Sequence, residues 1–284
     1  MEKKLRKVDL IFGEYSSEKY KVLEKCLKMH PDDIINEILD SGLRGRGGAG
    51  FPTGLKWKYT KNQDSDEKFV VCNADEGEPG TFKDREILDK VPRKVFSGMA
   101  ICGKAIGAKK GYMYLRGEYT FLLPSLYKEL DIYKEHAKKL GLDFDIEIRM
   151  GSGAYICGEE SALFESIEGK RGEPRNKPPY PTVAGLFSKP TVINNVETFV
   201  SVVMIMKHGA EAYKKLGTTD SRGSKLFSVS GDTPIPGIYE LELGMTLADF
   251  VNELGDGDTK AVQVGGASGH CVPRKKFNET IIGF

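Results

Sequence analysis

The chain has 284 residues, 39% of them hydrophobic, and its 42 basic and 41 acidic side chains leave a formal net charge of +1. This length allows one large and one small domain, and the balanced charge gives no sign of a nucleic-acid partner. No apolar run approaches the ~18 residues that a membrane span needs, and the first residues lack the apolar stretch of a secretion signal. We therefore expect a cytoplasmic protein that does not insert into a membrane.

The first two thirds of the sequence predict alternating helices and strands. Helices are expected at 17–29, 31–41, 93–109, 119–140, 159–167 and 194–207. Strands are expected at 68–73, 111–116 and 143–149. Residues 170–190 are rich in proline, glycine and charge, which is typical of an irregular surface segment. The alternation predicts an α/β sheet with largely parallel pairing.

From about residue 224 the pattern changes to short strands, expected at 225–230, 238–243 and 261–264. One short helix at 247–254 is capped by Thr246. The expected organisation is therefore an α/β domain at 1–220 and a small β-rich domain at 221–284.

The first glycine-rich loop contains Gly45, Gly47 and Gly50 in the spacing of a dinucleotide-binding fingerprint. That fingerprint requires a preceding strand, whereas a helix is predicted here, so the usual Rossmann interpretation fails, and no Walker sequence follows. A loop so poor in side chains lets backbone N–H groups approach a phosphate or a flat ring. Three cations accompany the glycines: Arg44, Arg46 and Lys56. The alternative is a simple connector.

Two further loops occupy positions where α/β proteins bind ligands. Residues 73–80 are acidic and follow a predicted buried strand, although a solvated turn would have the same composition. Residues 151–158 bring glycines before a helix N-terminus, which favours a phosphate. Glu159 and Glu160 fit such a site, but they equally suit the helix dipole alone.

The five cysteines are scattered and have no metal-ligand spacing. They are Cys26, Cys72, Cys102, Cys157 and Cys271. We therefore expect reduced thiols and no metal or iron–sulfur site built by this chain.

Taken together, the loops resemble the flavin-carrying, NADH-oxidising subunit of respiratory complex I and its relatives in NAD-linked hydrogenases and formate dehydrogenases. The resemblance spans about residues 42–266 and rests on five motifs in the family's order and spacing. They are Gly45-Arg-Gly-Gly-Ala-Gly-Phe-Pro-Thr-Gly-Leu-Lys-Trp57, Asn73-Ala-Asp-Glu76, Gly153-Ala-Tyr-Ile-Cys-Gly-Glu-Glu160, Lys177-Pro-Pro-Tyr-Pro181 and Asn194-Asn-Val-Glu-Thr198.

The resemblance implies a Rossmann-like FMN-binding domain, a flavoprotein NADH dehydrogenase activity, and the cofactors FMN and NAD(H). The implied FMN-binding residues are Gly45, Arg46, Gly47, Lys56, Asn73, Asp75, Glu76, Tyr155, Gly158, Asn194, Asn195 and Thr198. The implied NADH-binding residues are Phe51, Glu78, Glu160, Lys177 and Tyr180. Within this set Glu160 would orient the reacting ring, Glu78 would favour NADH over NADPH, and Tyr180 stands where many relatives carry phenylalanine.

The family normally continues into a helical domain whose cysteines hold a [4Fe–4S] cluster, and this sequence contains no such segment. A fragment, a split gene and a natural variant all remain open. The resemblance also implies a small, incomplete β-grasp domain after the flavin domain, and iron–sulfur subunits as partners. Two alternatives are a non-catalytic assembly remnant and a flavin-binding component of a hydrogenase or ferredoxin-linked complex that uses NADP(H).

Overall fold

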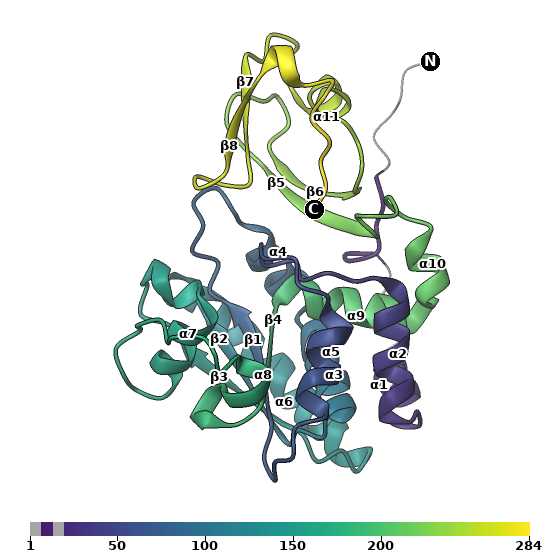
Figure 1. Cartoon of the computed structure of the whole chain (residues 1–284), viewed down its shortest axis with the longest axis vertical. Helices are drawn as coiled ribbons and strands as arrows, with labels where there is room; N and C mark the ends of the chain where they lie inside the picture. The colour runs from purple at the N-terminus through teal and green to yellow at the C-terminus, as the bar shows by residue number, and fades with distance from the viewer. Residues whose placement is uncertain (1–6, 14–19) are drawn as a thin grey trace.

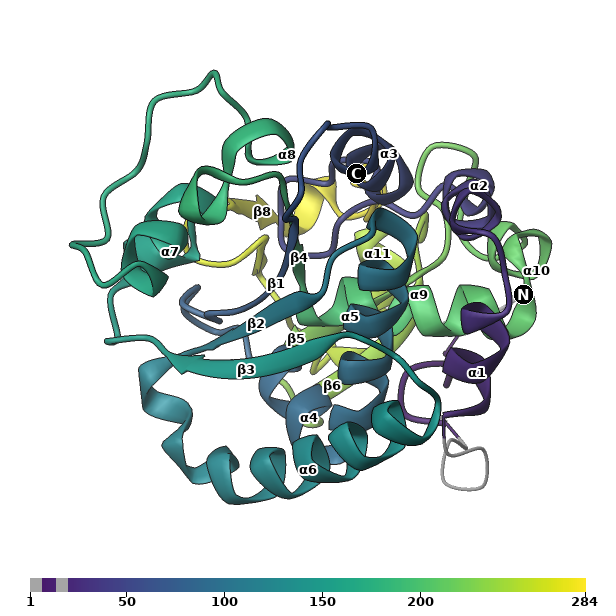
Figure 2. The same cartoon turned by 90° about the horizontal axis from the view of Figure 1, so that it is seen from below.

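The structure is a computed structural model that describes residues 7–13 and 20–284. Its centre is a parallel four-stranded sheet in the order β3-β2-β1-β4 (Figures 1 and 2). The strands are β1 (Phe69–Ala74), β2 (Lys110–Leu115), β3 (Asp145–Met150) and β4 (Thr191–Asn195). The chain runs outward from β1 to β3 and then returns to the other side of β1. The sheet therefore has a topological switch point between the carboxyl ends of β1 and β4, where α/β proteins bind ligands.

Alternate side chains of β1 serve two different cores. Val70 and Cys72 pack into the larger core with helices on one face, while Phe69 and Val71 belong to a second core on the other face. Because helices cover both faces, β1 is a continuous apolar run in the sequence.

Helices lie on both sides of the strands, with α5 and α6 on one side and α7 and α8 on the other (Figure 2). The first side also carries α1, α2, α3 and α9. The bounds are α1 (Lys21–Leu27), α2 (Pro31–Ser41), α3 (Thr53–Lys61), α4 (Lys83–Lys90), α5 (Pro92–Ile106), α6 (Leu123–Lys139), α7 (Glu160–Ile167), α8 (Pro181–Ala184), α9 (Val196–His208) and α10 (Ala210–Lys214). Short 3₁₀ turns are η1 (Gly117–Leu122), η2 (Tyr155–Gly158) and η3 (Leu186–Ser188).

Two antiparallel hairpins and one helix make up the C-terminal part, which lies beyond α4 and α9 in Figure 1. They are β5 (Ser224–Val229) with β6 (Gly237–Glu242), α11 (Leu247–Leu254), and β7 (Ala261–Val264) with β8 (His270–Pro273), followed by η4 (Arg274–Lys276). A capping box between Thr246 and Asp249 begins α11, as the sequence predicts.

Most expected elements are confirmed within one to three residues. Gly42 ends α2 with φ 69, and a helix precedes the glycine loop as expected. The expected helix at 17–29 is described only from residue 20 onward, where α1 begins at Lys21. No helix in the described ranges is long and apolar enough to cross a membrane.

Several elements were not predicted. Helix α3 begins at Thr53, at the end of the glycine loop, α4 follows the acidic loop directly, and β8 completes a hairpin. Strand β4 was also missed, and residues 194–195, which were expected to begin a helix, form its end. No turn separates β4 from α9. Short elements that join without a turn give no periodicity to detect.

Candidate functional site

Three loops and the start of α9 meet at the carboxyl ends of β1 and β4. The Asn73 amide after β1 donates to the Gly158 carbonyl oxygen before α7 at 2.9 Å. The Arg46 backbone N–H of the glycine loop donates to Thr198 Oγ1 in α9 at 2.9 Å. All three predicted ligand loops therefore converge on the switch point of the sheet.

Asp75 presents an open acceptor at this edge. The Asn73 side-chain oxygen accepts the Asp75 N–H at 3.0 Å, which fixes the turn. Asp75 Oδ2 is buried and has no hydrogen-bond partner among the described residues. Burial raises the pKa of Asp75 to about 6, and Arg116 partly opposes this rise. A buried carboxylate oxygen without a partner is costly, so it marks a place for a ligand group.

Glu76 is bound by protein donors at this edge. Its carboxylate accepts hydrogen bonds from the N–H groups of Asp84 and Arg85 and from the Tyr119 hydroxyl. Glu76 is 4% exposed, and burial raises its pKa to about 6. The side chain thus caps α4, and its role in FMN binding stays a prediction.

The two asparagines that end β4, Asn194 and Asn195, hydrogen-bond to α3, α4 and α9. Asn194 accepts the Trp57 ring N–H at 3.0 Å. Asn195 caps α9 by accepting the Glu197 N–H at 3.0 Å, and its amide donates to Asp84 at 2.6 Å. Gly47 lies directly against it, because a Cβ at Gly47 would stand 3.2 Å from the Asn195 Cβ.

Arg46 attaches the glycine loop to the C-terminal part of the chain. The residue is 1% exposed, and its guanidinium donates to the carbonyl oxygens of Arg44, Arg222 and Ser224 and to the Tyr213 hydroxyl. These bonds attach the loop to the chain that leads into β5. The place of Arg46 in the FMN cradle stays a prediction.

Lys56, Glu160 and Lys177 form a line of charges on the other side of the switch point. Lys56 Nζ donates to the Ile193 carbonyl oxygen at 3.0 Å and lies 3.8 Å from Glu160. Lys177 Nζ lies 2.6 Å from Glu160 and 3.0 Å from Glu159. Burial lowers the pKa of Lys56, and the Glu160 carboxylate opposes this shift. For Lys177, burial is the largest single effect and lowers the pKa, but Glu160 and Glu159 together outweigh it and raise the pKa above its usual value.

Glu78 contacts the β7–β8 hairpin. It accepts the Tyr155 hydroxyl at 2.6 Å and the Ser268 N–H at 3.1 Å, and the Tyr155 bond is the main cause of its lowered pKa. Two of the predicted NADH-binding residues have exposed aromatic rings: Phe51 is 44% and Tyr180 59% exposed.

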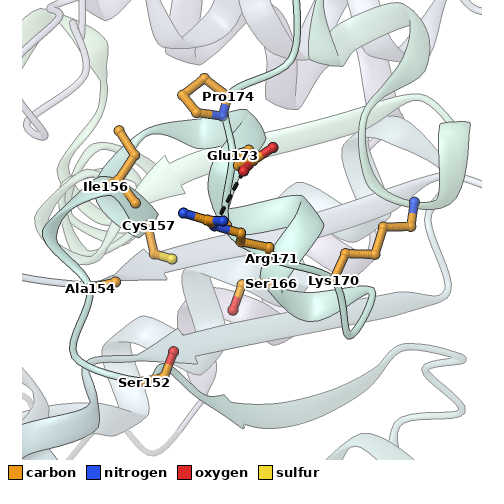
Figure 3. Close-up of a pocket in the computed structure, with 10 residues that line it drawn as sticks. Ser152, Ala154, Ile156, Cys157, Ser166, Lys170, Arg171, Glu173 and Pro174 are labelled. Atoms are coloured by element: carbon orange, nitrogen blue, oxygen red, sulfur yellow. Dashed lines mark ion pairs between the residues drawn. The ribbon is translucent and has the colours of Figure 1, made fainter.

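A cavity of about 520 Å³ lies behind the 152–157 loop (Figure 3). Cys157, Ser166 and the ion-paired Arg171 and Glu173 are among its lining residues, and none of the predicted site residues is. A second cavity of about 70 Å³ adjoins the first at Ala154 and is lined by residues of the acidic loop and of the 151–158 loop, with Asp75 and Tyr155 among them. The candidate site is therefore defined by the hydrogen bonds that join the loops and not by either cavity.

Sequence reasoning missed two groups of residues at this edge. Lys83 and Asp84 contact Asn195 from α4, and only their place directly after the acidic motif signals them. Lys225 reaches the Arg46 carbonyl oxygen from β5, and nothing in the sequence near it points to the site.

The family model described as "Nuo51 FMN-binding domain" matches residues 38–204. The "NAD-reducing hydrogenase HoxS subunit alpha" of Cupriavidus necator is 50% identical over 98% of this chain and 48% of that protein. A subunit of the NADH-quinone oxidoreductase of Aquifex aeolicus is 50% identical over 86% of this chain and 59% of that protein. This chain thus spans about half the length of these curated relatives.

Among solved structures, an NAD⁺-reducing [NiFe]-hydrogenase in the H2-reduced state aligns with a TM-score of 0.90 and 45% identity. The alignment covers 96% of this chain and 48% of that one. The family model also covers all four strands of the parallel sheet and the convergent loops at their carboxyl ends. The chain belongs to the family of the Nuo51 FMN-binding domain.

Proposed function

We propose that this chain binds FMN noncovalently at the carboxyl ends of β1 and β4 and oxidises NADH there. The observation that carries the proposal is the convergence of the glycine loop, the Asn73–Asp75 turn and the start of α9 at the switch point of the sheet. The names of two relatives, an NAD-reducing hydrogenase subunit and an NADH-quinone oxidoreductase subunit, agree with this reaction.

The residues present fit FMN in two respects. Gly47 lies against Asn195, but a Cβ at the next residue, Gly48, would meet nothing within 4 Å, so a flat ring or a phosphate can approach the loop backbone there. The unpartnered Asp75 oxygen offers an acceptor for a polar edge of the ring system. We therefore assign the cradle to Gly45, Gly47, Lys56, Asn73, Asp75, Glu76, Tyr155, Gly158, Asn194, Asn195 and Thr198, and to the backbone alone at Arg46.

For the nucleotide we propose the open face beside this cradle. Phe51 and Tyr180 present exposed rings on which an adenine can stack. Glu160 and Lys177 lie 2.6 Å apart, so both can contact the nicotinamide ring and its ribose. Glu78 would favour NADH over NADPH by repelling a 2′-phosphate, although nucleotide binding must then compete with its contact to Ser268.

Bound FMN would supply the chemistry of hydride exchange with NADH and of onward one-electron transfer. The protein's own residues bind and orient the two partners, so no side chain needs to act as an acid or base. Glu160, fixed between Lys56 and Lys177, is the residue that we expect to orient the nicotinamide.

We further propose that residues 1–220 form the flavin domain and that 221–284 are part of a β-grasp domain. The change from parallel to antiparallel pairing after α10 supports this division. We also propose a cytoplasmic protein whose electrons pass to iron–sulfur subunits of a larger complex.

The test is to purify the chain, add FMN and record a visible spectrum before and after denaturation. We expect a bound flavin that denaturation releases as FMN, no stoichiometric iron, and NADH-dependent reduction of ferricyanide. Comparing kcat/KM for NADH and NADPH in the parent and in Glu78→Gln tests the assignment of Glu78. A chain that binds no flavin would overturn the proposal, and a flavin-bound chain without NADH oxidation would favour an assembly role.

A further inference from the structure

Lys225 brings a cation from the C-terminal part to the glycine loop. It lies in β5, and its Nζ is 3.4 Å from the Arg46 carbonyl oxygen. The adjoining β5 residues are fixed on either side: the Ser224 carbonyl oxygen accepts the Arg46 guanidinium, and the Leu226 N–H donates to Glu197 at 2.8 Å. The backbone at Lys225 is thus held on both sides, at a distance from which its side chain reaches the glycine loop.

The ammonium group of Lys225 has fewer partners than its neighbours. It has three N–H donors, and within the described part of the chain its side chain makes one hydrogen bond, the long contact to Arg46. Lys83, close by, contacts Asp84 at 2.7 Å, Glu197 at 3.0 Å and Asn195 at 3.1 Å. Lys83 therefore occupies both nearby carboxylates and leaves Lys225 with donors to spare.

The charges that face Lys225 come from three elements. The carboxylates of Glu197 in α9 and Asp84 in α4 raise the pKa of Lys225. The cations Lys83 in α4 and Arg46 in the glycine loop lower it. Burial is the largest effect and lowers the pKa of Lys225 to about 8. An anion placed next to this half-buried ammonium group would favour its charged form, because an opposite charge nearby opposes the lowering of the pKa by burial.

The ammonium group of Lys225 lies at the glycine loop, close to the N-terminus of α9. The Arg46 carbonyl that Lys225 contacts belongs to the peptide before Gly47, and Gly47 abuts Asn195 at the N-terminus of α9. This helix has 13 residues, so its dipole favours an anion at that end.

We propose that Lys225 is a ligand of the phosphate monoester of FMN, so that the C-terminal part completes the phosphate site. This rests on the proposed function. It assigns residues 224–284 a direct part in cofactor binding, beyond any structural support they give. It also agrees with the attachment of β5, the strand that carries Lys225, to the glycine loop through Arg46.

The test compares FMN with riboflavin, which has the same ring but no phosphate, in the flavin-free protein. The variants are Lys225→Met, Lys225→Arg and, as a control for net charge, Lys128→Met on the exposed surface of α6. We expect Lys225→Met to weaken FMN binding by about tenfold to a hundredfold, as for loss of a charged hydrogen bond, and to leave riboflavin affinity within about twofold. Lys225→Arg should retain most of the FMN affinity, and Lys128→Met all of it.

Each other outcome decides against the inference. Equal weakening of both flavins would make Lys225 a support of the loop, and unchanged FMN affinity would remove it from the site. A parent chain that binds neither flavin would overturn the proposed function together with the inference, which distinguishes the two failures.

A second measurement applies if riboflavin binds too weakly to quantify. The FMN affinity of the parent should fall as pH rises above about 8, because the unbound Lys225 then loses its proton. The phosphate is already a dianion there and does not contribute. Lys56 also has a lowered pKa, so the comparison is with Lys225→Met. If that variant shows the same fall, the pH dependence does not come from Lys225 and the inference is wrong.

Discussion

Two groups of charged side chains at the carboxyl edge of the sheet are built in different ways. The buried corner consists of Arg46, Lys83, Asp84, Asn195 and Glu197. Its charged side chains are at most 9% exposed, and each has a charged or hydrogen-bonding partner at 3.0 Å or less. In such a group the loss of one partner leaves another buried and unpaired.

The open chain consists of Lys56, Glu160 and Lys177. These side chains are 19%, 29% and 28% exposed, and the Lys56–Glu160 separation is 3.8 Å. Pairs of this kind contribute little to stability because water screens them. The difference indicates that the buried corner fixes the loops in position, whereas the open chain keeps its charges available to a ligand.

The largest expected effect is that of Arg46→Met in the buried corner. Four protein acceptors lose their donor, so the free energy of unfolding should fall by about 3–5 kcal/mol, measured by urea denaturation. Arg44→Met is the control, because in the described part of the chain the Arg44 side chain makes one hydrogen bond, to the Gly50 carbonyl oxygen at 2.7 Å. Equal losses in the two variants would mean that the buried corner does not fix the loop.

Next in size is Gly47→Val, which tests the loop that the buried corner positions. The new side chain would crowd Asn195 and fill the cradle, so FMN affinity should fall at least about a hundredfold while circular dichroism stays unchanged. The cause is crowding and not backbone strain, since Gly48 and Gly50, but not Gly47, have φ in the left-handed region. Gly237→Val in β6, outside the cradle, is the control, because a Cβ there would meet only the Tyr239 ring at 3.7 Å. Normal FMN binding by Gly47→Val would make the loop a connector.

The sequence predicted where the loops are, but it did not predict how their side chains are held within the protein. Periodicity and turn residues located α2, which buries one apolar face, and β1 and β2, which are short apolar runs buried on both faces. The structural contacts of Glu76 and Arg46 were not predicted: Glu76 caps α4, and Arg46 joins the glycine loop to β5. Both contacts depend on partners 8 to 178 residues away, which local patterns cannot indicate.

Asp75→Asn has a smaller and opposite effect on stability. The folded-state pKa of Asp75 is raised from 3.8 to about 6, so its ionised form destabilises the folded chain above pH 6, and this loss is relieved as pH falls toward 3.8. The neutral variant should therefore be more stable than the parent by about 1 kcal/mol at pH 8, after discounting for partial exposure. Urea denaturation at pH 8 and pH 5 measures the difference, which should shrink at the lower pH. A variant less stable than the parent at pH 8 would show that the ionised Asp75 carboxylate is stabilised by a partner in solution.

The smallest expected effect on stability is that of Lys177→Met in the open chain, and this variant distinguishes the two groups most clearly. Lys177 joins Glu159 and Glu160, but all three side chains are about a third exposed, so the free energy of unfolding should change by less than ~1 kcal/mol. Its effect should appear in nucleotide binding, with a higher KM for NADH and an unchanged affinity for FMN. Lys170→Met is the control, because Lys170 also joins two glutamates, Glu165 and Glu168, yet is not among the predicted site residues. If the KM of Lys177→Met stays within about threefold of the parent, a difference below ~1 kcal/mol, the open chain is not the nucleotide site.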